Sequence, residues 1–287
     1  MSVATYIPEV WIAALVAPLE TKLVYGQPLI CNRDYEGEIR EFGDTVTVNT
    51  VGDPTIKDYT PYVTEVLPER INTAARKLKI DQAKYYSFEV DDIDKRQARG
   101  DLMTKSMQRA GYGIAKVIDT YLASFYTSIP SGQVLPDFAV VGTDEEAWGK
   151  QAYYNLVDLQ VLMDESDMPE EGRYAVVPPW YRGLLQRNPN FSRVSEYGSG
   201  QVLMNGEIGR TAGFSVVVSN NTPKPSGSTN FIQAGVAGAV SMAHQITESE
   251  PFRPEKGFAD AVKGLEVYGG KLMRPDLVAG VEVTRPS

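Results

Sequence analysis

Cysteine and histidine are almost absent from this chain of 287 residues, which holds one of each. A single cysteine, Cys31, excludes a disulfide within the chain and any zinc site built on several cysteines. A single histidine, His244, excludes metal sites built on paired histidines, and Ser–His or Cys–His catalysis would depend on that one residue. His244 lies in an apolar, strand-like run, where a packed histidine is the usual case. We therefore assign it no catalytic role.

Long apolar runs and clusters of basic residues are also missing. No stretch approaches the roughly 18 apolar residues of a membrane span, and no basic segment precedes the short apolar run 10–17. We therefore expect a soluble protein that contacts no membrane and carries no secretory signal. The net charge of -9 disfavours a surface built to grip DNA or RNA, because phosphate contact needs clustered Lys and Arg.

A long amphipathic helix is the strongest signal in the chain. Hydrophobic residues make up 43% of the sequence, enough for the core of one large or two modest domains. Over residues 101–128 the apolar positions recur at steps of three and four: Met103, Met107, Ala110, Ile114, Val117, Tyr121 and Phe125. Asp101 is a suitable N-cap and Pro130 follows the far end. The spacing predicts a helix about 40 Å long that acts as a spine.

The segment before this helix indicates an arm and then a long polar hairpin. Residues 45–51 alternate polar and apolar side chains, and strand-like runs return at 75–80 and 85–90. The polar stretch between them has little to bury, so it either moves freely in water or lies on a neighbouring molecule. Trp11, in the N-terminal arm, is either a core residue or an anchor laid on another subunit.

The segment after the helix indicates a mixed domain. A capping box at Thr143 opens a helix that ends near residue 168. A loop is expected at 130–142, strands at 173–177 and 214–219, and a helix after Pro179. Three further strand-like runs lie at 238–245, 264–271 and 278–284. We expect all three to return to the long helix and bury its apolar face.

Two groups of residues resemble chemical sites but have simpler explanations. The acidic cluster Asp91, Asp92 and Asp94 lacks the glycine and the distal glutamate of a calcium loop. It is better explained as a solvated cluster at the positive end of the helix dipole. Gly206, Gly209 and Gly213 have the wrong spacing for a nucleotide-binding loop and favour tight turns. No cofactor and no metal are therefore implied, and a hydrolase that works through acidic residues is disfavoured.

Several phrases, in this order, resemble the major capsid proteins of tailed bacteriophages, which have the Hong-Kong-97-like fold. They extend over nearly the whole chain: residues 32–39 (NRDYEGEI), 43–46 (GDTV), 80–84 (IDQAK), 90–94 (VDDID), 206–210 (GEIGR), 213–214 (GF), 258–265 (FADAVKGL) and 274–275 (RP). No single phrase is specific, but their order is.

This resemblance implies an α+β subunit in four parts. They are an N-terminal arm (1–32), an extended hairpin loop (33–80), a peripheral domain with the spine helix (81–144 and 241–287) and a mixed α/β axial domain (145–240). It also implies that the hairpin lies across an adjacent subunit. The candidate subunit-contact residues are Trp11, Tyr59, Tyr62 and Arg70.

The function that the resemblance implies is structural. Pentamers and hexamers of such subunits tile an icosahedral shell, a virion capsid assembled in the bacterial cytoplasm, around double-stranded DNA contacted without sequence preference. Expected partners are other copies of the chain, a portal and, because the arm begins close to Met1, a separate scaffolding protein or none. Some relatives join Lys and Asn side chains covalently between subunits, and Lys57 could supply the lysine, but no partner motif is present. An encapsulin-type shell around cargo protein is the alternative.

Overall fold

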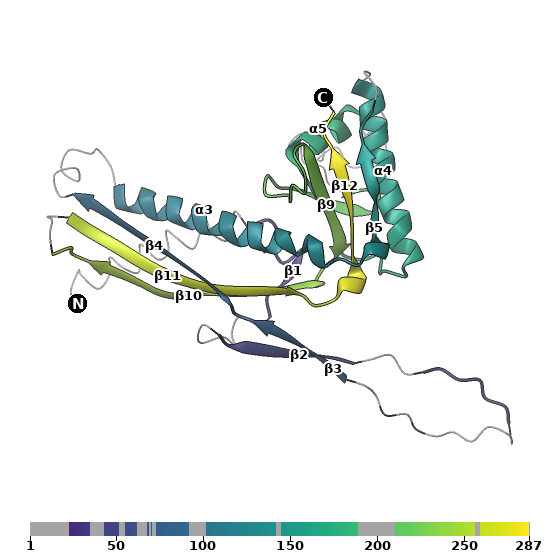
Figure 1. Cartoon of the computed structure of the whole chain (residues 1–287), viewed down its shortest axis with the longest axis horizontal. Coiled ribbons are helices and arrows are strands. Elements are labelled where there is room, and N and C mark those ends of the chain that lie inside the picture. The colour runs from purple at the N-terminus through teal and green to yellow at the C-terminus, as the bar shows by residue number, and fades with distance from the viewer. Residues whose placement is uncertain are drawn as a thin grey trace.

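The chain folds into three parts (Figure 1): a long layer of one helix on a sheet, a second sheet with two helices that stands at one end of this layer, and a narrow hairpin. This architecture comes from a computed structural model. It describes residues 23–34, 43–51, 55–61, 68, 70, 73–91, 102–141, 145–188, 210–255 and 259–286.

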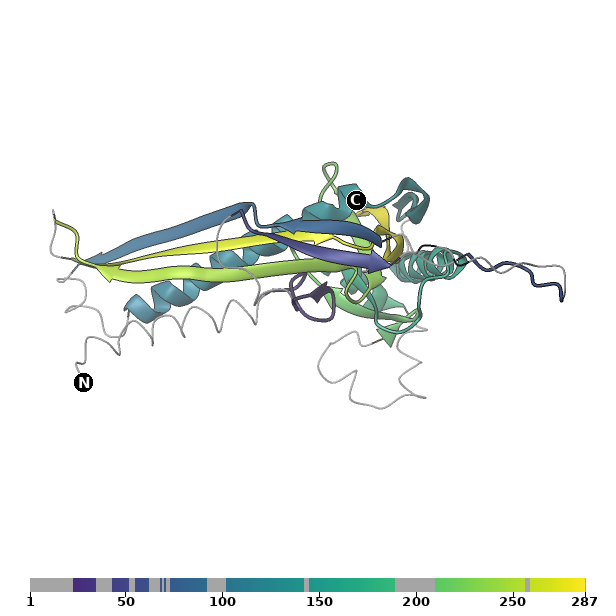
Figure 2. The same ribbon diagram turned by 90° about the horizontal axis from the view of Figure 1, so that it is seen from below.

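The long layer is a four-stranded sheet in the order β1-β10-β11-β4. Its strands are β1 (Cys31–Asn32), β10 (Val240–Phe252), β11 (Ala259–Leu272) and β4 (Gln82–Asp91). β10, β11 and β4 are antiparallel, while β1 joins the edge in parallel with β10. The helix α3 (Leu102–Ala123) runs along one face of the sheet, as Figure 2 shows from below. Segments from three distant parts of the sequence thus form a single layer.

The spine helix is confirmed, with two differences from the expectation. The α-helix ends at Ala123, and the 3-10 helix η2 (Ser124–Ser128) continues it. The buried stripe passes through Ala115, Ile118 and Leu122, so Val117 is 41% exposed. In the first half of the helix the predicted residues Met103, Met107 and Ile114 are buried. In the second half, the buried residues come one position later than predicted, at Ile118 and Leu122.

The second sheet has six strands in the order β5-β12-β9-β6-β8-β7. Its strands are β5 (Val134–Ala139), β6 (Arg173–Val177), β7 (Arg210–Thr211), β8 (Phe214–Val218), β9 (Thr229–Val236) and β12 (Val278–Thr284). The helices α4 (Glu145–Glu165) and α5 (Pro179–Arg187) pack with it. The short 3-10 helices η3 (Ser131–Gln133) and η4 (Pro275–Leu277) precede β5 and β12.

The core of this second unit follows from the sequence periodicities. Ala152, Leu156, Leu159 and Met163 recur along one face of α4, and all four are fully buried. β6 is buried at all five positions, as expected for a strand inside a sheet with covered faces.

The assignment of the whole last third to the long helix is wrong in part. β10 and β11 do lie under α3, but β12 is inserted between β5 and β9 in the six-stranded sheet. The expected loop 130–142 contains β5, an edge strand of the same sheet. A short apolar run such as Val278–Thr284 fits the interior of either sheet, so its local pattern could not decide between them.

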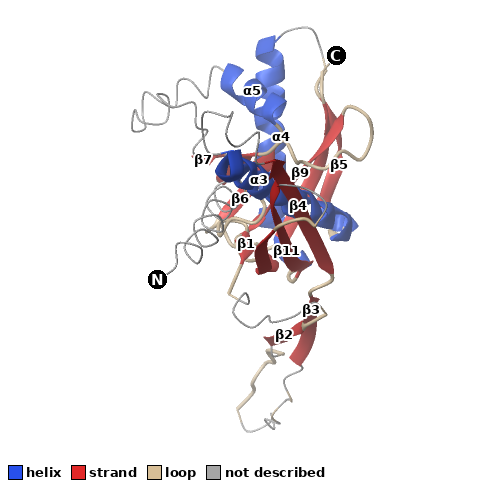
Figure 3. Ribbon diagram, turned by 90° about the vertical axis from the view of Figure 1, so that its left-hand side faces the viewer, coloured by secondary structure: helices blue, strands red, loops and turns tan. Residues whose placement is uncertain are grey.

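The hairpin consists of β2 (Thr45–Val51) and β3 (Thr73–Lys79), paired antiparallel from Thr45–Lys79 to Val51–Thr73. In the end view it projects away from the body on the side opposite α4 and α5 (Figure 3). Among the helices in the described ranges, none has the length and apolar character needed to cross a membrane.

Candidate functional site

The base of the hairpin is fixed to the face of the four-stranded sheet that α3 leaves open. One small cluster of buried side chains forms this contact: Val46, Leu78, Ile80, Ala243, Val267 and Met273. The backbones also approach closely, because a Cβ atom on Gly269 would lie 2.3 Å from the carbonyl oxygen of Lys79. Lys271 Nζ donates to the carbonyl of Lys77 at 3.0 Å. The hairpin is therefore a rigid extension of the sheet at its base.

The described residues of the hairpin tip belong to neither buried cluster of the fold. Residues 55–61 are exposed throughout, with Ile56 at 96% and Tyr59 at 66%. Arg70 is exposed as well. Of the four predicted subunit-contact residues, the structure thus places Tyr59 and Arg70 on the projecting loop, while Trp11 and Tyr62 lie outside the described residues. An isoleucine and a tyrosine exposed to water on a projecting loop are typical of a contact made with another molecule.

The open face of the sheet carries a second apolar surface beyond the hairpin base. Leu265 and Tyr85 are paired across β11 and β4, and they are 37% and 82% exposed. Phe252, 39% exposed, stands further along on β10. A shallow cleft of about 170 Å³ lies here, lined by Tyr85, Glu250, Lys263, Gly264 and Leu265. We call this surface the open sheet face.

The open sheet face has a charged centre. Lys263 pairs with Glu250 at 3.1 Å, and both side chains are about half exposed. The Lys263 ammonium also lies 5.8 Å from the centre of the Phe252 ring. Large apolar side chains around an ion pair, on a sheet whose other face is covered by a helix, have the composition of a contact surface.

A buried carboxylate on α3 fastens the segment 23–34 to the body. Asp119 accepts the backbone N–H groups of Val24 at 2.9 Å and of Tyr25 at 3.0 Å, and Gly26 N–H lies 3.4 Å away. Asn221, from the loop after β8, approaches the same carboxylate at 3.5 Å. Burial raises the pKa of Asp119, and these hydrogen bonds oppose that rise. One side chain therefore joins the arm, the helix and the second sheet.

A second buried acid, Glu266, lies on β11, in register with Ile246 of β10 and Lys84 of β4. Glu266 is 1% exposed, and neither carboxyl oxygen accepts a hydrogen bond from any residue in the described ranges. Burial raises its pKa to about 7, and the nearby His244 opposes this shift. His244 Nε2 lies 4.0 Å from Glu266 Oε1, and Nδ1 lies 3.4 Å from the Arg33 guanidinium. The only histidine is thus held within the fold, as its sequence context predicted.

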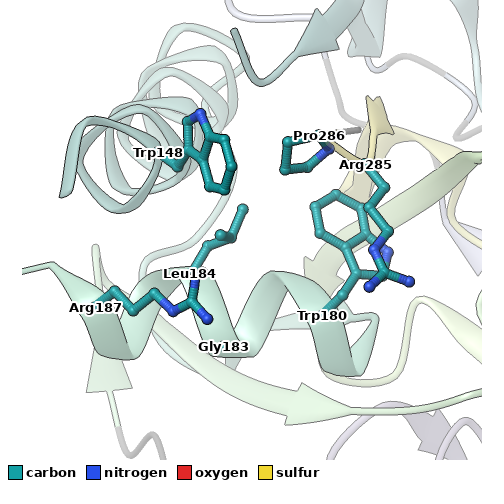
Figure 4. A pocket seen from close by; sticks show the side chains of 7 residues that line it. All are labelled: Trp148, Trp180, Gly183, Leu184, Arg187, Arg285 and Pro286. Atoms are coloured by element: carbon teal, nitrogen blue, oxygen red, sulfur yellow. The ribbon is translucent and has the colours of Figure 1, made fainter. Parts of the chain in front are cut away.

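The second unit carries a small aromatic cleft of about 260 Å³ (Figure 4). Trp148 from α4 and Trp180 from α5 face each other across Leu184, and Arg285 lies beside Trp180. Trp180 Nε1 donates to Asn230 Oδ1 at 3.0 Å, which fixes the indole. Among the described residues, the side chains that line the cleft are aromatic, aliphatic and cationic.

The other candidate sites lie mostly outside the described residues. No group of three or more His, Cys, Asp or Glu side chains there could hold a metal ion. Asp91 ends β4, while Asp92 and Asp94 lie outside the described residues. Gly213 has φ +76° in the turn between β7 and β8, the tight turn expected of it. Gly206 and Gly209 lie outside the described residues.

The comparisons with known proteins bear directly on this architecture. A family model described as phage capsid protein matches residues 73–281. This chain belongs to the phage capsid protein family. A structure from Mycobacterium phage Che8 has 27% sequence identity and a TM-score of 0.69, covering 91% of this chain and 90% of that one. No curated protein is significantly similar in sequence.

Two more distant structures share the fold of this capsid protein. The capsid of cyanophage P-SCSP1u has 17% identity and a TM-score of 0.67, over 86% of this chain and 85% of that one. A virus-like particle from Pyrococcus furiosus has 13% identity and a TM-score of 0.54, over 94% and 98%. The α+β, Hong-Kong-97-like fold is therefore confirmed. The match to the phage capsid protein family makes the chain a structural protein of the virion.

Sequence reasoning missed the features that hold this capsid protein together. Asp119 lies four residues after Ala115 and three residues before Leu122, and both of these are buried. A carboxylate on the inner face of the helix was therefore the sequence signal that could have identified this residue. Glu266 alternates with buried residues on β11 in the same way. The open sheet face gave no local signal, because its residues come together only through pairing of β4, β10 and β11.

Proposed function

We propose that this chain is the major capsid subunit of a tailed phage and that it assembles by laying its hairpin on the open sheet face of a neighbouring copy. The proposal rests on two apolar surfaces that a single chain exposes to solvent. The hairpin tip exposes Ile56 and Tyr59, and the open sheet face exposes Tyr85 and Leu265.

The position of the hairpin base supports this arrangement. In each chain Leu78 and Ile80 already cover one end of the open face by packing on Val267. A hairpin from a second copy would continue the same layer over the remaining, uncovered part. A projecting tip that meets a different surface on the next copy makes a heterologous contact, which closes into rings when the rotation allows. Pentamers and hexamers of a shell are such rings.

The remaining parts of the proposal rest on family resemblance and charge. The shell encloses double-stranded DNA, and a chain of net charge -9 contacts it weakly and without sequence preference. The subunit has no catalytic activity and takes no cofactor. Its other partners are a portal and, where present, a separate scaffolding protein. Assembly takes place in the cytoplasm of the host bacterium.

The alternative, an encapsulin-type shell around cargo protein, keeps the same subunit contacts. The Mycobacterium phage structure favours the phage interpretation, because its identity and TM-score exceed those of the Pyrococcus particle. Particles purified from producing cells separate the two functions. DNA protected from added nuclease supports the phage capsid, whereas an enclosed enzyme in place of DNA contradicts it.

The contact itself can be tested with two complementary variants. A tip variant carries Ile56→Glu and Tyr59→Glu, and a face variant carries Tyr85→Glu and Leu265→Glu. Each alone lacks one half of every contact, so neither should build rings or particles. An equal mixture keeps one intact tip and one intact face, so it should form a dimer of one chain of each kind and stop there. Tyr154→Glu, at a 57% exposed residue on α4, is the matched control.

Sedimentation velocity at several concentrations reads out these species. Particles from either variant alone, or a mixture that stays monomeric while the wild type assembles, would contradict the hairpin-on-face contact. Normal assembly by both variants would leave a capsid subunit that uses other surfaces. A wild-type chain that never assembles would contradict the capsid function itself.

A further inference from the structure

A polar pocket of about 420 Å³ lies where the end of α3 reaches the loop that follows β8 (Figure 1). Its lining residues come from α3 and η2 on one side and from residues 220–224 on the other, so it joins the long layer to the second sheet. Small-molecule sites occur preferentially at such junctions between structural units. The hairpin contact proposed above uses the face of the four-stranded sheet opposite α3, so this pocket is not part of it.

The helical wall of the pocket presents hydrogen-bond acceptors. Thr120 Oγ1 donates its proton to the Lys116 carbonyl at 2.8 Å, and Ser124 Oγ donates to the Tyr121 carbonyl at 2.6 Å. A hydroxyl has one proton, so each of these oxygens offers a ligand only its lone pairs. The two residues are four positions apart, which places them about one turn from each other on the same side. This wall therefore favours a ligand that donates hydrogen bonds.

The loop wall adds donors. The ammonium group of Lys224 is exposed and can only donate, and the exposed amide of Asn220 can both donate and accept. Asn221 turns its Nδ2 toward Asp119, 3.5 Å from Oδ2, which leaves Oδ1 as an acceptor. Among the described residues that line the pocket, Lys224 is the only charged one. A matching ligand therefore donates on the helical side and accepts on the loop side.

Contacts within the chain fix the shape of this pocket. The Tyr126 ring packs on Phe231 with the ring centres 4.9 Å apart, and the Phe231 N–H donates to the Pro223 carbonyl at 2.9 Å. Thr222 Oγ1 accepts from Asn230 Nδ2 at 3.0 Å. The half-buried Tyr126 and Pro223 give the pocket apolar surface. Its walls are thus held in place before any ligand binds, which lowers the cost of binding.

We propose that this pocket binds a saccharide. Each sugar hydroxyl both donates and accepts, so one ring serves Thr120 and Ser124 on one side and Lys224 on the other. The C–H groups of the ring lie against the Tyr126 side chain. A simple anion such as phosphate only accepts, and it would leave the helical wall unmatched. The main chain of a docked peptide divides the two roles between its N–H and C=O groups, so it is the competing occupant.

Saturation-transfer NMR on the intact chain tests this site. The probes are the methyl glycosides of glucose, galactose, mannose, rhamnose and N-acetylglucosamine. Each is measured on wild-type particles and on the unassembled tip variant with Ile56→Glu and Tyr59→Glu, so the test does not depend on the proposed assembly. Saturable transfer from at least one probe is expected. Thr120→Val combined with Ser124→Ala should weaken this binding about tenfold or more, the effect of two hydrogen bonds.

Thr127→Val is the matched control, because its exposed hydroxyl donates to the Ser124 carbonyl at 3.1 Å and does not line the pocket. It should bind like the wild type. Lys224→Met, at an exposed loop residue, removes the donor of the other wall and should also weaken binding. It keeps the test decisive if urea unfolding shows the double variant to be unstable.

Three results overturn the proposal. One is the absence of transfer from every probe, both in particles and in the tip variant. Another is equal binding by the wild type and the pocket variants, because the sugar then lies elsewhere. The third comes from N-acetylglycine N-methylamide, a single peptide unit. Transfer from this amide alone, lost in the pocket variants, assigns the pocket to a peptide chain.

Discussion

Gly269 on β11 lies so close to Lys79 at the hairpin base that a methyl group on Gly269 would come within 2.3 Å of the Lys79 carbonyl oxygen. The same methyl group would lie 2.8 Å from Ile80 Cα. Both neighbours are backbone atoms, so no side-chain rotation can make room. The absence of a side chain at Gly269 is therefore what allows the hairpin to dock on the sheet.

Gly269→Ala should displace the hairpin base and destabilise the chain by about 1–3 kcal/mol, the usual range for overpacking. Gly113→Ala is the matched control, because a Cβ atom at this position on α3 meets nothing within 4 Å. It should stabilise the chain by about 0.5–1 kcal/mol through helix propensity. Urea unfolding measures both. A Gly269→Ala variant as stable as the wild type contradicts the close approach.

Asp119→Ala should destabilise the chain by about 3 kcal/mol, because the N–H groups of Val24 and Tyr25 lose a buried charged acceptor. Asp119→Asn keeps one carbonyl oxygen and should cost less. Thr120→Ala is the control from the same helix, since its hydroxyl is exposed and donates to the Lys116 carbonyl of its own helix. Equal urea midpoints for the alanine variants at 119 and 120 would show that the carboxylate does not hold the arm.

Glu266 makes the stability of the fold depend on pH. Its folded pKa of about 7 exceeds the ordinary value of 4.5, so the folded chain binds this proton more tightly than the unfolded chain. The contribution to stability is fully present below about pH 4.5 and is lost as the pH rises through about 7. The full effect is about 3 kcal/mol, from 1.36 kcal/mol per pKa unit.

Glu266→Gln stays neutral at every pH and should remove this dependence. Its free energy of unfolding, relative to the wild type, should increase by up to about 3 kcal/mol between about pH 4.5 and about pH 8. Urea titrations at a series of pH values give the two curves. If they run parallel over this range, Glu266 does not titrate as the buried site requires.

Arg173 should contribute more to stability than the other arginine pairs. Its side chain is 2% exposed and donates to the carbonyls of Met168 at 2.6 Å and Pro169 at 2.8 Å, and to Asp164 at 2.6 Å. Arg173→Met leaves these acceptors without their donor and should cost about 3–5 kcal/mol.

Arg274→Met is the control for this pair. Arg274 lies 3.4 Å from Asp276 with both side chains more than half exposed, so the substitution should cost less than about 1 kcal/mol. Thermal melting in low and high salt compares the two variants. If the two losses are alike, or if salt removes the effect of Arg173→Met, the buried arginine does not stabilise the fold in this way.

The elements of this capsid protein could largely be predicted from its sequence, because their signals are local. Thr45–Val51 alternates with a period of two and is a strand, and Ala152 to Met163 keeps helical spacing and faces the core. Long-range pairing could not be predicted in the same way. Val278–Thr284 is apolar enough for either sheet, and only packing against β5 and β9 decides its place.

In the candidate site, too, the features with a local sequence signal could be predicted and those made by long-range pairing could not. Composition and alternation indicated a polar hairpin, the family resemblance implied its contact residues, and one of these, Tyr59, is exposed on it. The open sheet face was not predictable, because Tyr85 and Leu265 are 180 positions apart by their residue numbers and meet only through strand register. Asp119 and Glu266 were missed because a lone acid in an apolar pattern is ordinarily read as solvent-facing.

The most direct test of assembly through the hairpin replaces residues 54–70 with a short turn. This segment contributes no side chain to either buried cluster of the described residues, so the variant should melt like the wild type and keep its helical circular dichroism. Negative-stain electron microscopy of the purified proteins should show closed particles for the wild type and none for the variant. Normal particles from a folded variant would contradict the account.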